Sequence, residues 1–87
     1  MKLTKKNGTI CVYDDEKVVR SILRANGEVD EEQIGRALAS AIADQVFDRL
    51  AGKSEFLSTV DVRRAVYEIL REKGLPQTAE HYMNYQK

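Results

Sequence analysis

At 87 residues, with 43% hydrophobic and 32% charged residues, the chain has the composition of one folded globular domain, which excludes a disordered segment. Lys and Arg number 14, as do Asp and Glu, so the formal net charge is zero and a general nucleic-acid binder is disfavoured. A single cysteine cannot form an internal disulfide or a zinc site. No apolar run approaches the roughly 18 residues that span a membrane, and no signal-peptide pattern opens the chain, so we expect a cytoplasmic protein.

The first predicted element is a β-hairpin over residues 2–13. Two short apolar runs flank Asn7-Gly8, and this dipeptide favours a two-residue turn because both residues tolerate a positive φ. Cys11 alternates within the second run, and we expect it to be buried rather than reactive.

A helix is predicted directly after the hairpin, over about residues 15–25. Asp14 or Asp15 is its expected N-cap, and apolar residues follow at helical spacing. Gly27 comes next and suits the left-handed position after a helix.

The longest predicted element is a second helix over about residues 30–50, because apolar residues recur every four positions from Ile34 to Leu50. Asp30 is its expected N-cap, and Gln33 is placed to close a capping box.

Two further helices are predicted over about residues 59–73 and 76–85. Ser58 or Thr59 caps the first of them, and Ser58-x-x-Asp61 is typical of a capping box. Gly74 ends this helix, and the proline that follows begins the last one.

Three lysines are expected near the start of the first helix. Lys5 and Lys6 belong to the first strand, and Lys17 belongs to the first helical turn. A lysine is normally favoured at the other end of a helix, where the dipole is negative. The cluster therefore has two interpretations: a site for an anion, or a solvated strand edge whose charges discourage pairing with another chain.

Residues for catalysis or metal binding do not form a recognisable pattern. His81 is the only histidine, and it has no serine or cysteine at a meaningful spacing. Asp14, Asp15 and Glu16 are interpreted as the cap and first-turn acids of a helix. We therefore expect neither an enzyme nor a metal site.

Several short motifs together resemble an ATP-cone domain over almost the whole chain. They are Leu3-x-Lys5-Lys6-Asn7-Gly8, Tyr13-Asp14-x-Glu16-Lys17-Val18, Leu57-Ser58-Thr59-x-Asp61-Val62 and Ala79-x-x-Tyr82-x-x-Tyr85. The resemblance implies a single domain over residues 1–87 with an α+β, mainly α fold. Four helices would be capped by a small two- or three-stranded antiparallel sheet, whose third strand would lie at Phe56-Leu57.

The same resemblance implies a ligand, ATP or dATP, bound with Mg²⁺. The chain would be an allosteric regulatory module that controls a ribonucleotide reductase or its expression through conformational change or oligomerisation. A nucleoside triphosphate needs cations, N–H donors and an apolar slot for its base. The expected nucleotide-binding residues are Leu3, Lys5, Lys6, Val12, Lys17, Val18 and Thr59.

Two other functions compete with this interpretation. A degenerate cone would be a structural or oligomerisation module without nucleotide binding. It is favoured by Lys6, which replaces the usual arginine of the family, and by Cys11, which replaces an acidic residue of some members. A small DNA-binding protein is disfavoured by the zero net charge and by the absence of the zinc ribbon that repressor relatives carry. The expected partners are thus an adenine nucleotide, a reductase catalytic domain and a second copy of the chain, without DNA or membrane.

Overall fold

The computed structural model describes residues 2–5, 7–52 and 57–85. In chain order the elements are β1 (Lys2–Thr4), β2 (Ile10–Val12), α1 (Asp15–Asn26), the 3-10 turn η1 (Asp30–Glu32), α2 (Arg36–Ala51), α3 (Thr59–Glu72) and α4 (Pro76–Tyr85). The predicted α+β, mainly α class is confirmed, with four helices and a two-stranded antiparallel sheet in the described part of the chain.

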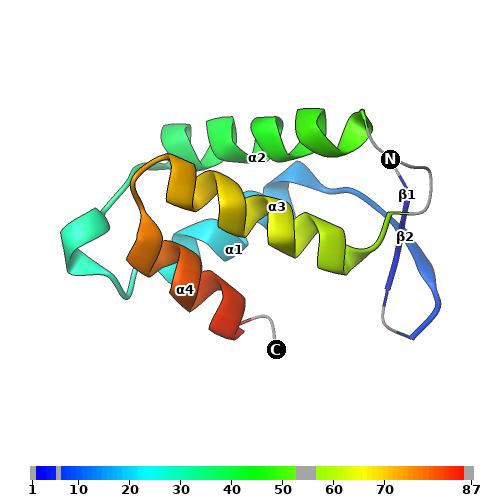
Figure 1. The fold of residues 1–87 in the computed structure, drawn as a ribbon, viewed down its shortest axis with the longest axis horizontal. Coiled ribbons are helices and arrows are strands. Elements are labelled where there is room, and N and C mark those ends of the chain that lie inside the picture. Colours follow the sequence, from blue (N-terminus) through cyan, green and yellow to red (C-terminus); the bar gives the residue numbers. More distant parts are fainter. Residues whose placement is uncertain (1, 6, 53–56, 86–87) are drawn as a thin grey trace.

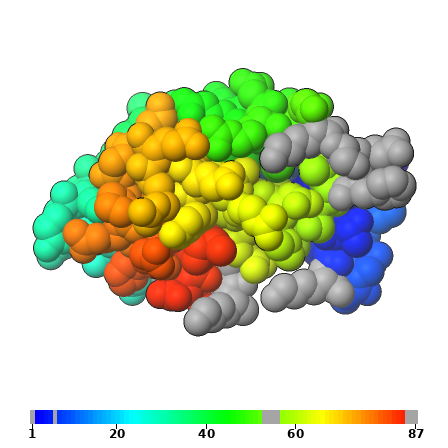
Figure 2. Space-filling view, in the orientation of Figure 1, coloured from blue at the N-terminus to red at the C-terminus, as the bar shows by residue number. Residues whose placement is uncertain are grey.

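The four helices pack in a ring around one core. Contacts join α1 to α2, α2 to α3, α3 to α4, and α4 back to α1. Figure 1 shows the hairpin at one end of this helical body and η1 at the opposite end. The space-filling view shows α2, α3 and α4 covering one face, with the hairpin beside the start of α3 (Figure 2). None of the helices in the described ranges has the length and apolar character that crossing a membrane requires.

The core is formed by apolar stripes that each helix turns inward. The largest side chains with no exposed surface are Ile22, Ile42, Val46, Val66, Ile69 and Leu70. Burying an aliphatic side chain of this size stabilises the fold by about 1.5–3 kcal/mol. The hairpin contributes two side chains to this core, Leu3 and Tyr13, and the Tyr13 hydroxyl donates a hydrogen bond of 2.9 Å to the Ala43 carbonyl of α2. These two anchors hold the small sheet against the helices.

The hairpin turn differs from the predicted two-residue form. Gly8 has a φ of +87°, but Asn7 does not have a positive φ. The Lys5 N–H donates to the Thr9 carbonyl (2.8 Å), and the Gly8 N–H donates to the Lys5 carbonyl (3.0 Å). A turn followed by one left-handed glycine therefore reverses the chain, which is another common hairpin connection.

The two strands place Leu3 opposite Cys11. Leu3 is buried, whereas Cys11 is only half-buried against the core, so the burial predicted for Cys11 is partial. The expected third strand is reduced to one parallel bridge between Thr4 and Ser58 among the described residues, and the Thr4 N–H donates to the Leu57 carbonyl (3.0 Å). Phe56 lies outside the described residues. This bridge joins the hairpin to the start of α3.

The second helix begins at Arg36, not near residue 30 as predicted. Residues 30–32 form η1, and Gly35 is the N-cap of α2, without a side-chain capping bond. Gln33 does not close a capping box, because its side chain donates to the carbonyls of Asn26 and Val29, both at 2.9 Å. At Gln33, hydrogen bonds to the end of α1 and to Val29 thus take the place of the predicted capping box.

The N-caps of α1 and α3 agree with the residues predicted from the sequence. Asp14 caps α1, and Ser58 caps α3 in the predicted capping box, with the Ser58 N–H donating to Asp61 Oδ2 (2.8 Å). The left-handed conformation predicted for Gly27 is wrong, because its φ is −60°. Gly74, with a φ of +80°, does take the left-handed conformation after α3.

Candidate functional site

A cavity of about 270 Å³ lies between the hairpin, α1, α3 and α4. We name it the hairpin cavity. Every predicted site residue that the structure describes lines it. They are Leu3, Lys5, Val12, Lys17, Val18 and Thr59. Lys6, the remaining predicted residue, lies outside the described residues. The fold therefore brings together side chains from the hairpin and two helices that the sequence keeps apart.

The hairpin forms one wall of this cavity. Leu3 is buried beneath β1, and Lys5 follows where the strand ends, with an exposed side chain. The bridge from Thr4 to Ser58 sets this wall against the start of α3. Val12 on β2 also lines the cavity although 68% of its surface is exposed, so its apolar face is available for contact.

Two helix starts border the cavity, through Asp14 at α1 and Thr59 at α3. A helix N-terminus favours a nearby anion, because N–H groups and the positive end of the dipole point there. Asp14 Oδ1 already accepts from the N–H groups of Glu16 (3.0 Å) and Lys17 (3.4 Å). The start of α1 therefore offers its dipole and the Lys17 ammonium group, but not these two donors.

The inner wall combines polar side chains that the sequence analysis did not select. The Ser21 hydroxyl lies 2.8 Å from the Val18 carbonyl, to which it donates, and 3.3 Å from the Tyr82 hydroxyl. Burial raises the pKa of Tyr82, so this phenol stays neutral at physiological pH. Arg63 is half-buried, and among the described residues its Nε has no hydrogen-bond partner. The cavity thus has a third cationic group beside Lys5 and Lys17.

The sequence contains an indication that Arg63 belongs to the site, but none for Tyr82. Arg63 lies four residues after Thr59, so a helix over residues 59–73 places both on one face. Tyr82 meets Ser21 across 61 residues of sequence. Only the packing of α4 against α1 brings that pair together.

The outer side of the α1 start is acidic and differs from the cavity. Burial and then the carboxylates of Asp44 and Asp14 raise the pKa of Asp15, so negative charge is already crowded there. Phe47 of α2 packs on the Tyr13 ring, with ring centroids 5.6 Å apart. An anion is therefore repelled from this face and favoured on the side that carries Lys5 and Lys17.

The chemistry of the hairpin cavity suits an anion with an apolar part. Ligand pockets commonly measure about 300–1,000 Å³, so this cavity, at about 270 Å³, lies just below that range. It can enclose a flat ring and a sugar while a charged tail stays at the mouth, near the exposed lysines. In the described ranges, no group of three or more His, Cys, Asp or Glu side chains could hold a metal ion.

Comparison with known proteins identifies the family. Residues 1–87, the whole chain, match the ATP cone domain family. No curated protein matches the sequence. ATP-cone domains are regulatory, nucleotide-binding modules that take ATP or dATP as allosteric ligands. By this match over its full length, the chain belongs to the ATP-cone domain family.

Proposed function

We propose that this chain binds ATP or dATP in the hairpin cavity and so controls a ribonucleotide reductase or its expression. One observation carries the proposal. A single cavity gathers cations from the hairpin, α1 and α3 around an apolar wall of Leu3, Val12 and Val18. Membership of the ATP-cone family supports an adenine nucleotide as the ligand.

In this proposal the base contacts the apolar wall, and the phosphates lie at the mouth of the cavity. Lys5 and Lys17 neutralise the phosphates, and the Thr59 hydroxyl donates to one of their oxygens. Mg²⁺ accompanies the phosphates and is not held by protein carboxylates, because the Asp14 carboxylate already caps α1. Such a magnesium ion keeps much of its water shell.

The proposed regulatory effect follows from the four elements that form the walls of the hairpin cavity. A ligand between the hairpin, α1, α3 and α4 contacts four elements at once, so it favours the helix arrangement in which all four contacts are made. A ligand changes a conformational equilibrium only by binding one state more tightly. We propose that the favoured state alters contact with a reductase catalytic domain or between copies of this chain.

The first test is calorimetric and thermal titration with ATP, dATP, ADP and GTP at fixed Mg²⁺. Nucleotide at a hundredfold excess over its Kd adds about 2.7 kcal/mol to the free energy of unfolding. We expect this stabilisation with adenine nucleotides and not with GTP. Lys5→Ala and Lys17→Ala should each lower the affinity, since each removes a cation at the cavity.

Lys73→Ala is the matched control, because Lys73 is exposed at the end of α3 and does not line the cavity. It removes the same charge and should leave the affinity unchanged. A folded protein that no nucleotide stabilises would contradict the proposal and leave the degenerate structural module. Sedimentation with ATP and with dATP then tests whether the ligand changes self-association.

A further inference from the structure

A second hollow, of about 260 Å³, lies on α1 and adjoins the hairpin cavity. We name it the α1 hollow. It is lined by Lys17, Arg20, Ser21 and Arg24, and two of these residues, Lys17 and Ser21, also line the hairpin cavity. The two spaces therefore lie next to each other, and these two side chains border both.

The spacing of these residues makes the α1 hollow a row of cations. Positions 17, 20, 21 and 24 are i, i+3, i+4 and i+7, so they share one face of the helix. With a rise of 1.5 Å per residue, the row extends about 10 Å from Lys17 to Arg24. Figure 1 shows α1 leading away from the hairpin, so Arg24 is the cation farthest from the hairpin cavity.

Among the described residues, no ion pair neutralises this positive charge. The ion pairs between described residues involve Arg36, Arg49, Arg71 and His81, and none includes Lys17, Arg20 or Arg24. Like charges at i, i+3 and i, i+4 repel one another and weaken a helix. A bound anion would remove this repulsion, and two guanidinium groups supply the planar donor geometry that matches phosphate.

We propose that the α1 hollow extends the nucleotide site and selects a ligand whose phosphate chain is longer than a triphosphate. The chemical class is an adenine nucleotide with four or more phosphates. Its base occupies the hairpin cavity, its first phosphates meet Lys5 and Lys17, and the added phosphates lie along Arg20 and Arg24. The inference rests on the proposed function, because the hairpin cavity must first hold the base.

The experiment compares ATP, adenosine 5′-tetraphosphate and inorganic tripolyphosphate by calorimetry at one low salt concentration. We expect the tetraphosphate to bind about fivefold more tightly than ATP, the size of effect that a solvent-exposed charge contact gives. In the double variant Arg20→Ala/Arg24→Ala this advantage should vanish while the affinity for ATP stays close to that of the wild type. Raising the salt should shrink the advantage, because exposed charges are screened.

The control variant Arg64→Ala/Lys73→Ala removes two exposed positive charges, one on α3 and one at its C-cap, and neither residue lines either space. It should retain the preference for the tetraphosphate, which separates a local contact from an effect of net charge.

Each of the other outcomes contradicts the inference, its assignment to a nucleotide, or the proposed function. Equal affinities for ATP and the tetraphosphate in the wild type, or equal losses for both in the double variant, overturn the inference and leave the proposed function standing. Tripolyphosphate binding as tightly as the tetraphosphate overturns the assignment to a nucleotide. No binding of ATP or the tetraphosphate overturns the proposed function together with the inference.

Discussion

Among single residues, Asn26 makes three buried side-chain hydrogen bonds that join separate elements. Its side chain is buried at the end of α1, where Nδ2 donates to the Glu32 carbonyl (2.7 Å) and to the Thr78 hydroxyl (3.1 Å). Its Oδ1 accepts from the Ile34 N–H (2.9 Å). One amide thus joins α1 to the segment before α2 and to α4. Helix propensity has no part in this, because all three partners lie outside α1.

We predict that Asn26→Ala lowers the free energy of unfolding by about 2–3 kcal/mol, because it leaves buried polar groups without partners. Urea denaturation at neutral pH measures the change. Asn84→Ala is the matched control, since Asn84 is exposed on α4 and should change stability by less than about 0.5 kcal/mol. Equal effects of the two substitutions would show that the buried contacts of Asn26 contribute nothing.

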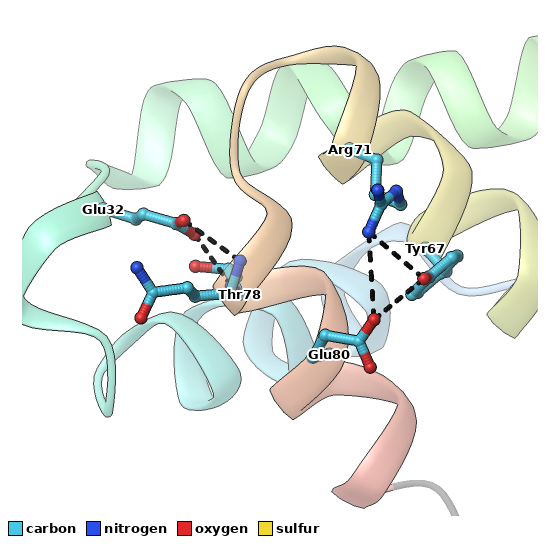
Figure 3. Close-up of polar contacts among 6 residues, drawn as sticks. Glu32, Tyr67, Arg71, Thr78 and Glu80 are labelled. Atoms are coloured by element: carbon cyan, nitrogen blue, oxygen red, sulfur yellow. Dashed lines mark hydrogen bonds and ion pairs between the residues drawn. The ribbon is translucent and has the colours of Figure 1, made fainter.

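At the scale of elements, α4 depends on a carboxylate from another part of the chain. Glu32 in η1 accepts from the N–H groups of Thr78 (2.8 Å) and Gln77 (3.0 Å), and Figure 3 shows its side chain reaching the start of α4. Farther along, Figure 3 shows the Tyr67 hydroxyl donating to Glu80 (3.0 Å) beside Arg71, which joins α3 to α4. That second cluster is exposed, so it contributes little to stability.

Glu32 also makes the stability of the protein depend on pH. Burial acts to raise the pKa of its carboxyl, but hydrogen bonds from Thr78 and Gln77 outweigh burial and hold the pKa below its usual value. A lowered folded-state pKa gives stability that is present above the unfolded value of about 4.3 and is lost as the pH falls through the folded value. Acid should therefore weaken the junction between η1 and α4.

We predict that Glu32→Gln lowers the free energy of unfolding at pH 7 by about 0.5–1 kcal/mol, the usual value of a helix cap that is partly solvated. Below pH 4 the variant and the wild type should converge, because the wild-type carboxyl is then becoming neutral. Urea unfolding at pH 7 and pH 3 measures both values. Glu31→Gln, on the exposed neighbour, should show no such convergence, and a cost of Glu32→Gln that is independent of pH would refute the assignment.

For the whole molecule, the closed ring of four helices predicts a single cooperative unfolding transition. Ile42 lies in the middle of α2 with no exposed surface, so a substitution there alters the packing of the core that all four helices share. Ile42→Val removes one buried methylene and should cost about 0.5–1.5 kcal/mol. Circular dichroism and tyrosine fluorescence should report the same midpoint, as a two-state domain requires.

Ile10→Val is the control for this substitution, because it makes the same chemical change at a residue that is 70% exposed. It should leave the midpoint within experimental error. Separate transitions by the two probes would mean that the hairpin or α4 unfolds independently of the ring.

Local chemistry in the sequence determined much of this protein. Apolar periodicity predicted the helices, and the Ser58-x-x-Asp61 pattern predicted the capping box of α3, because both depend on residues within a few positions of each other. The candidate residues of the hairpin cavity came from the order of short motifs. The fold places those that the structure describes around the hairpin cavity. Lys6 lies outside the described residues.

Only the tertiary structure decided the rest. Residues 30–35 have the sequence pattern of a helix start. Instead, Glu32 forms hydrogen bonds with α4, Gln33 and Ile34 form hydrogen bonds with Asn26 of α1, and α2 begins only at Arg36. Tyr82 of α4 meets Ser21 of the neighbouring helix α1, 61 residues away in the sequence. In the first case tertiary contacts outweigh a local preference, and in the second they create a contact that no local pattern indicates. These contacts pair polar groups that the packed helices have removed from water. Leaving such a group unpaired costs about 1–3 kcal/mol, more than the roughly 0.5–1.5 kcal/mol that one helical hydrogen bond contributes.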